Sequence, residues 1–120
     1  MAHTSLHAAA ERGDVAEVRR LLAAGEVVDG SDGEGRTALH IAAKNPHVDV
    51  VLALLGAGAD ANATRTADGA TPLLNAAHEG HVDVVEALLE AGANANAART
   101  TSGVTPLFMA ARMSKTSGAA

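Results

Sequence analysis

The sequence predicts an all-α fold in which short helices stack into a solenoid, and an internal repeat is the first observation behind this prediction. Residues 37–63 and residues 71–97 are identical at about two positions in three. Four copies of the pattern begin at Thr4, Thr37, Thr71 and Thr105, with spacings of 33, 34 and 34 residues. A period of this length is typical of solenoids whose units bury their apolar faces against their neighbours. By itself, the period would also admit a tetratricopeptide array.

The composition is the second observation. Apolar residues make up 48% of the 120 residues, mainly as Ala, Leu and Val, and Phe108 is the single aromatic residue. Side chains this small suit thin, closely packed layers, and alanine favours helix. The length is enough for one domain. We therefore expect a single domain over residues 1–120 with repeats that start near residues 4, 37, 71 and 105, the last of them incomplete.

The bulk properties also bear on compartment and partner. The chain has no cysteine, which means no disulfide or thiol chemistry and mildly favours the cytoplasm, with the nucleus as an alternative. Residues 1–6 lack the pattern of a signal peptide, and no stretch approaches the roughly 18 apolar residues of a membrane span. A net charge of −5 argues against a nucleic-acid partner.

Each repeat is predicted to contain two short helices and a loop, and the first helix has a clear start. Thr71 is a good N-cap, and Pro72 follows at the first helical position, where a missing N–H costs nothing. We expect about seven helical residues in this element. Helix starts should fall within two residues of Ser5, Ala38, Pro72 and Pro106. Ala76 and Ala77 mark a point where only small side chains would fit, and Gly80 makes the turn that follows.

The second helix of the third repeat follows that turn and should span about ten residues. Its apolar positions, Val82, Val85, Leu88 and Leu89, fall near helical spacing. Gly92 should end it as a left-handed C′ residue, as Gly25 and Gly58 should end its counterparts. The segment after it is short of helix formers and should form a hairpin-like finger, with no sheet beyond such contacts. About seven helices are expected in all.

These residues resemble the ankyrin repeat over about residues 4–113. The second repeat carries Thr37-Ala-Leu-His40, then His47-Val-Asp-Val-Val51, Leu54-Leu55 and Gly58-Ala-Asp-Ala-Asn62, and the same frame starts again at Thr71. The resemblance implies paired antiparallel helices with hairpin-like finger loops. It also implies that fingers and first helices form a concave face and second helices a convex face.

The chain departs from the family pattern at several places. The two fingers over residues 60–70 and 94–104 are each one residue longer than the family norm, and each contains an Arg-Thr pair. Pro46 stands at the turn glycine of the second repeat. Leu74 and Phe108 stand at the family's histidine position, so the repeat start at Thr71 should be held less firmly than the start at Thr37.

The histidines do not point to a metal site. His78 and His81 are three residues apart across a predicted turn, whereas the zinc-protease motif needs two histidines four residues apart on one helix. The resemblance gives His7 and His40 a structural role, with bonds to the nearby threonine and to the adjacent finger, and places His47 and His81 in the turns between helices. No nucleophile, phosphate loop or acid–base pair is apparent either. We therefore predict no catalytic, metal or cofactor-binding residues, and no enzyme.

The charges are divided between the two faces that the resemblance defines. The concave side has seven basic and five acidic residues, a balance of +2, whereas the convex side has two basic and nine acidic residues, a balance of −7. Convex acids near helix starts are explained by the helix dipole. The concave bases have no such explanation, which suggests a weakly basic groove.

These observations favour a non-catalytic module that binds a protein segment, one with acidic residues, along the concave face. The contact residues that we expect are Arg36, Lys44, Arg65, Asp68, His78, Glu79, Arg99 and Arg112. The alternative is a structural or regulatory fragment of a longer array that packs on itself without a separate partner. The incomplete last repeat motivates it, because this repeat should leave parts of Val84, Val85 and Leu88 bare and so favour self-association through the C-terminal end.

Overall fold

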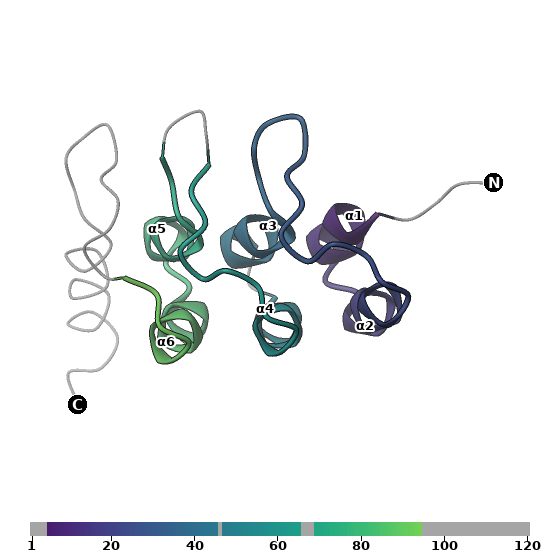
Figure 1. Ribbon diagram of the computed structural model, residues 1–120. Helices are drawn as coiled ribbons and strands as arrows, with labels where there is room; N and C mark the ends of the chain where they lie inside the picture. The colour runs from purple at the N-terminus through teal and green to yellow at the C-terminus, as the bar shows by residue number, and fades with distance from the viewer. Residues whose placement is uncertain (1–4, 46, 66–68, 95–120) are drawn as a thin grey trace.

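The computed structural model describes residues 5–45, 47–65 and 69–94, and within these ranges it contains six helices and no strand. The helices are α1 (Leu6–Arg12), α2 (Val15–Ala23), α3 (Ala38–Lys44), α4 (Val48–Gly56), α5 (Pro72–Glu79) and α6 (Val82–Glu90). They form two layers, with α1, α3 and α5 in one and α2, α4 and α6 in the other (Figure 1). This all-α arrangement of stacked helix pairs confirms the predicted fold class.

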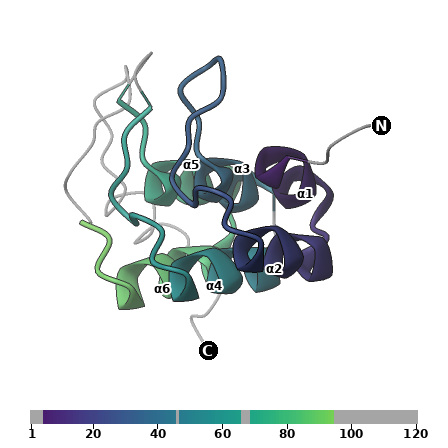
Figure 2. The ribbon, with the colours of Figure 1, turned by 45° about the vertical axis from the view of Figure 1, so that its right-hand side comes forward.

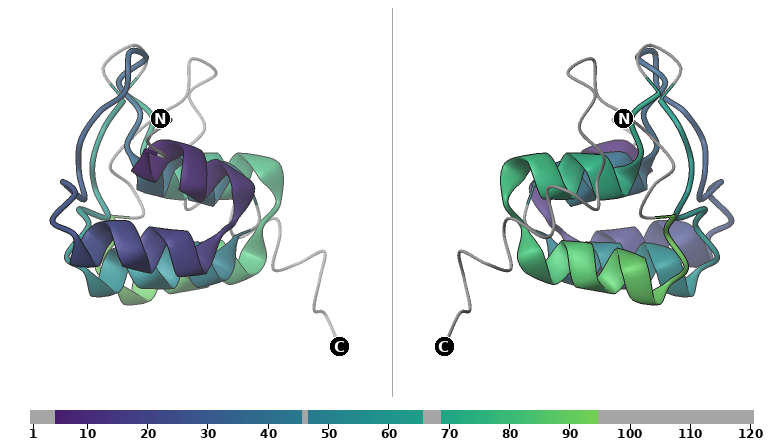
Figure 3. Two further views of the ribbon diagram at one scale, coloured as in Figure 1. Left: turned by 90° about the vertical axis from the view of Figure 1, so that its right-hand side faces the viewer. Right: turned by 90° about the vertical axis from the view of Figure 1, so that its left-hand side faces the viewer.

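The connections between helix pairs leave the two layers and form fingers. The segment between α2 and α3 projects beyond the layer of first helices (Figure 2), and viewed along the stack the fingers rise from one edge of both layers (Figure 3). In the first finger the backbone N–H of Asp32 donates to the carbonyl of Arg36 at 2.9 Å, and in the second the N–H of Arg65 donates to Ala70 at 2.8 Å. The second closing pair is one residue further apart in the sequence than the first.

The first helices begin where the sequence predicts. The side chains of Ser5, Thr37 and Thr71 accept hydrogen bonds from backbone N–H groups three residues on, at 3.1, 3.3 and 3.2 Å. These bonds satisfy donors that a helix start otherwise leaves unpaired. Three of the four predicted starts are thereby confirmed. The fourth, near Pro106, lies outside the described residues, as does any seventh helix.

The second helices are nine residues long, against the ten expected. The glycine that follows each C-cap has a positive φ, 96° at Gly25, 91° at Gly58 and 94° at Gly92. The residue after Gly25 donates its N–H back to Leu21 at 3.1 Å, which is the closing bond of a Schellman motif. The left-handed glycine endings are therefore confirmed.

The core lies between the two helix layers and is built from small side chains. Ala42, Ala43 and Ala76 are fully buried, which allows α3 to pack against both α1 and α5. The predicted apolar face of α6 was partly wrong. Val84, Val85 and Leu88 are its buried residues, whereas Leu89 is exposed and Val82 is only half-buried, because Val84 and not Val82 or Leu89 shares the core-facing side with Val85 and Leu88.

The expectation of a partly bare face on the third repeat was also wrong at the residues named for it. Val84, Val85 and Leu88 are 1%, 4% and 0% exposed and belong to the main core cluster. They pack into the two-layer core formed with the neighbouring helices α4 and α5. Their burial weakens the self-association argument, whose other apolar residues, in the incomplete last repeat, lie outside the described residues.

Histidine side chains connect each repeat to the next. His7 Nε2 donates to the carbonyl of Arg36 at 2.9 Å, and His40 Nε2 donates to the carbonyl of Ala70 at 2.9 Å, so each ring holds the end of the following finger. The rings of His47 and His81 bond instead to the preceding repeat, where their Nε2 atoms donate to the carbonyls of Glu11 at 3.1 Å and Lys44 at 2.8 Å. These contacts confirm the structural role predicted for the histidines.

The ring of His40 has a defined tautomer. The backbone N–H of Thr37 donates to Nδ1 at 3.1 Å, so Nδ1 must be an acceptor and Nε2 must carry the hydrogen that bonds to Ala70. At 1% exposure, the ring cannot exchange these partners for water. Leu74, in the same position of the third repeat, keeps only the N-cap bond to Thr71 and otherwise contributes burial.

We predict that His40→Leu lowers the free energy of unfolding by about 1–3 kcal/mol, because the N–H of Thr37 loses its buried acceptor and the carbonyl of Ala70 loses one of its donors. Urea unfolding followed by circular dichroism measures the change. His78→Leu is the matched control, since the His78 side chain is 65% exposed. Equal stability of the two variants would contradict the structural role of His40.

Candidate functional site

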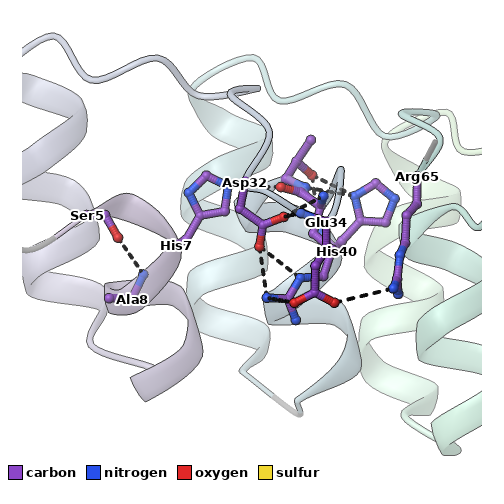
Figure 4. Close-up of polar contacts among 9 residues, drawn as sticks. Ser5, His7, Ala8, Asp32, Glu34, His40 and Arg65 are labelled. Atoms are coloured by element: carbon purple, nitrogen blue, oxygen red, sulfur yellow. Dashed lines mark hydrogen bonds and ion pairs between the residues drawn. The ribbon is translucent and has the colours of Figure 1, made fainter. Parts of the chain in front are cut away.

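A network of charged side chains joins the first finger to the second. The carboxylate of Asp32 lies 2.8 Å from Nη2 of Arg36 and accepts a hydrogen bond from its Nε at 2.9 Å. Glu34 lies between two arginines, 3.4 Å from Arg36 and 3.5 Å from Arg65 (Figure 4). Acidic and basic groups therefore alternate from Asp32 through Arg36 and Glu34 to Arg65.

Asp32 is the most strongly bound member of this network. Its Oδ1 also accepts hydrogen bonds from the backbone N–H groups of Glu34 at 2.9 Å and Arg36 at 3.0 Å. Partial burial by itself disfavours the charged carboxylate. The hydrogen bonds from the backbone and side chain of Arg36 and from the backbone of Glu34 outweigh it and lower the pKa of Asp32 from 3.8 to about 2. The base of the first finger is thus fixed by an ionised aspartate.

Arg65 occupies the position in the second finger that Asp32 occupies in the first, since each donates the N–H that closes its finger. The side chain of Arg65 is 29% exposed, and its Nε is buried without a hydrogen-bond partner in the part of the chain that the structure describes. Because a buried donor without an acceptor costs free energy, this group can form a further bond.

A cavity of about 330 Å³ lies on the concave side, between α3 and α5 and below the second finger. Basic, acidic and amide side chains line it, together with Ile41 and the buried His40. Five of the eight predicted contact residues line this one cavity: Arg36, Lys44, Arg65, His78 and Glu79. The other three, Asp68, Arg99 and Arg112, lie outside the described residues.

The helices present these residues in rows across the stack. Glu11, Lys44 and His78 occupy the same position near the ends of α1, α3 and α5, and all three are exposed. His78 lies 3.5 Å from Glu79 through Nδ1. The sequence analysis missed Glu11, Asn45 and Asn75 as lining residues. The register of the repeats could have found Glu11, which aligns with Lys44 and His78, and Asn45 follows Lys44 directly, whereas no sequence signal marked Asn75.

The predicted basic excess of the concave face depends on residues that lie outside the described part of the chain. The described concave residues comprise four bases, Arg12, Arg36, Lys44 and Arg65, and four acids, Glu11, Asp32, Glu34 and Glu79, a balance of zero. Moreover, Arg36 and Arg65 are both paired with carboxylates. The predicted excess of +2 comes from Asp68, Arg99, Arg112 and Lys115, which are not among these residues.

The described residues contain no group of three or more His, Cys, Asp or Glu side chains arranged to hold a metal ion. Within the same ranges, every helix is too short or too polar to cross a lipid bilayer.

A comparison with known protein families finds ankyrin repeats, in three copies, over residues 1–65 and 54–119. The chain belongs to the ankyrin-repeat family. A search of curated proteins found no matching relative. Ankyrin repeats are in general protein–protein interaction modules without catalytic activity, so the family gives this fold a binding function of a general kind.

We predict that the stability contributed by Asp32 depends on pH. Because its folded pKa is about 2 and its ordinary value is 3.8, this contribution is complete above pH 4 and is lost as the pH falls from 4 to 2. After allowance for solvent screening, wild type should lose about 1 kcal/mol more than Asp32→Asn between pH 6 and pH 3. Urea unfolding at a series of pH values measures the difference.

Glu86→Gln is the control for this experiment, since Glu86 is an exposed carboxylate of α6. It should follow the wild-type pH profile. Parallel profiles for wild type and Asp32→Asn would show that the hydrogen bonds to Asp32 do not stabilise the first finger.

Proposed function

We propose that this ankyrin-repeat chain is a non-catalytic module that binds a segment of a partner protein along the concave face formed by its fingers and first helices. The observation that carries the proposal is the polar cavity between α3 and α5. Five of the predicted contact residues line it, and they come from the ends of two fingers and from two helices. One of the five, Arg65, has a buried donor without a partner among the described residues. Such an arrangement is suited to hydrogen-bonded recognition.

The proposal includes a partner segment with acidic residues, and three groups support this part of it. Lys44 is exposed and forms no ion pair with any described residue, Arg65 has an unused Nε, and His78 is exposed beside them. Since the described concave charges balance, such a preference would arise from local contacts. Long-range attraction across a Debye length of about 8 Å would contribute little from this part of the face.

Self-packing is the second candidate, in which the chain is a structural or regulatory part of a longer array. The burial of Val84, Val85 and Leu88 weakens the reason for it. Light scattering at rising concentration distinguishes the two candidates, because only self-packing requires the apparent mass to increase.

We predict that a photo-crosslinking amino acid placed at His78 captures the partner, whereas the same group at Glu86 does not. Both positions are exposed, but His78 lines the concave cavity and Glu86 lies on α6 in the opposite layer. Crosslinking in a lysate, followed by mass spectrometry of the adducts, measures the difference.

Comparison of the two positions controls for differences in folding and in the amount of protein, because both substitutions lie on the surface of neighbouring helices. Adducts that form equally at both positions, or only at Glu86, would contradict the concave binding face. An adduct made only of two copies of this chain would support self-packing instead.

A further inference from the structure

The interaction between Arg65 and Glu34 is weak compared with the pairing of Arg36 with Asp32. Arg65 Nη2 lies 3.5 Å from Glu34, whereas the contacts of Arg36 with Asp32 measure 2.8 and 2.9 Å. Charge-assisted hydrogen bonds are normally about 2.7–2.9 Å long. Glu34 therefore neutralises part of the charge of Arg65 without forming a strong hydrogen bond to it.

Glu34 is also easy to displace. Its side chain is 61% exposed, and it is shared with Arg36, which already has Asp32 as a closer partner. If Glu34 turned into solvent, Arg36 would keep its contacts with Asp32, and only Arg65 would lose its charge partner among the described residues. An exposed ion pair of this kind contributes little to stability.

The surroundings of Arg65 offer further donors for an anion. Lys44 and Asn75 line the same cavity, and the structure shows no hydrogen bond from either side chain to another described residue. A planar carboxylate matches the fork of a guanidinium, whose Nε and Nη can bind both of its oxygens. Such a carboxylate would give the buried Nε of Arg65 the acceptor that it lacks.

We propose that this cavity receives one carboxylate side chain of the partner segment, and that this group replaces Glu34 at Arg65. The inference rests on the proposed function and deepens it, because it names the chemical group that the site recognises. Glu34 then acts as an internal competitor that occupies Arg65 in the free protein. Binding exchanges a long, exposed ion pair for one that includes the buried Nε, with Lys44 and Asn75 as additional donors.

The lining residues favour a singly charged carboxylate over a phosphate dianion. Glu11 and Glu79 line the cavity, so each additional negative charge on a ligand meets two carboxylates that stay in place when Glu34 is displaced. The repulsion grows with the charge of the ligand. A phosphorylated side chain is therefore the less suitable occupant, and inorganic phosphate serves as its probe.

Nuclear magnetic resonance tests the proposal directly, because the Nε–H group of Arg65 gives its own signal. The probe is N-acetylglutamate N-methylamide, titrated into the intact chain at constant ionic strength. We expect the Arg65 signal to shift with a dissociation constant in the millimolar range. The neutral glutamine analogue should leave it in place, and inorganic phosphate should bind more weakly than the glutamate probe.

Two substitutions change the site in opposite directions. Glu34→Gln removes the competitor and should tighten binding of the glutamate probe about threefold. Arg65→Lys keeps the charge but removes Nε, and it should weaken binding at least as much. Glu86→Gln, an exposed change on α6, is the matched control and should leave the dissociation constant unchanged. Circular dichroism confirms that each variant is folded.

The proposal would be overturned if Glu34→Gln left the affinity unchanged, or if the glutamine analogue shifted the Arg65 signal as strongly as the glutamate probe. Stronger binding of phosphate would assign the site to a phosphorylated partner and would also overturn it. Crosslinking of a partner at His78 with equal yield in wild type, Glu34→Gln and Arg65→Lys would leave the concave binding face intact and exclude only the carboxylate site.

Discussion

The stack depends on hydrogen bonds from histidine rings to backbone carbonyls of a neighbouring repeat. A solenoid repeat cannot bury its apolar face alone, so its stability depends on how accurately the next repeat is placed. His40 holds the end of the second finger at Ala70, and His81 holds the end of α3 at Lys44. These two bonds also place the cavity, because Ala70 closes the finger that carries Arg65, and Lys44 lines the opposite wall.

The cavity combines a fixed backbone with side chains that would have to exchange their present partners for those of a ligand. The backbone on both sides is tied to buried or half-buried rings, so a ligand would not have to order it, and binding would avoid that entropy cost. The side chains are already engaged with one another, through Asp32, Arg36, Glu34 and Arg65. A partner must offer better contacts than the internal ones, and this requirement produces specificity instead of general attraction to acidic chains.

Much of the fold follows from short-range sequence features, and less of the site does. Thr37 and Gly58 indicate a helix start and a helix end through bonds within a few residues, so the repeat pattern places them correctly. The pairing of Glu34 with Arg65 spans 31 positions and depends on how two fingers lie side by side. A sum of charges over the concave face cannot anticipate such a pair.

The replacement of an aspartate by an arginine at the closing position of the second finger explains why Arg65 can take part in both the fold and the site. Its backbone N–H closes the finger to Ala70 as that of Asp32 closes the first finger to Arg36, but with one more residue between the ends. Asp32 uses its carboxylate to satisfy the N–H groups of its own finger, at 2.9 and 3.0 Å. An arginine has no acceptor and cannot do this. Its side chain instead crosses to Glu34 and lines the cavity, so a position that stabilises a turn in one repeat becomes available for binding in the next.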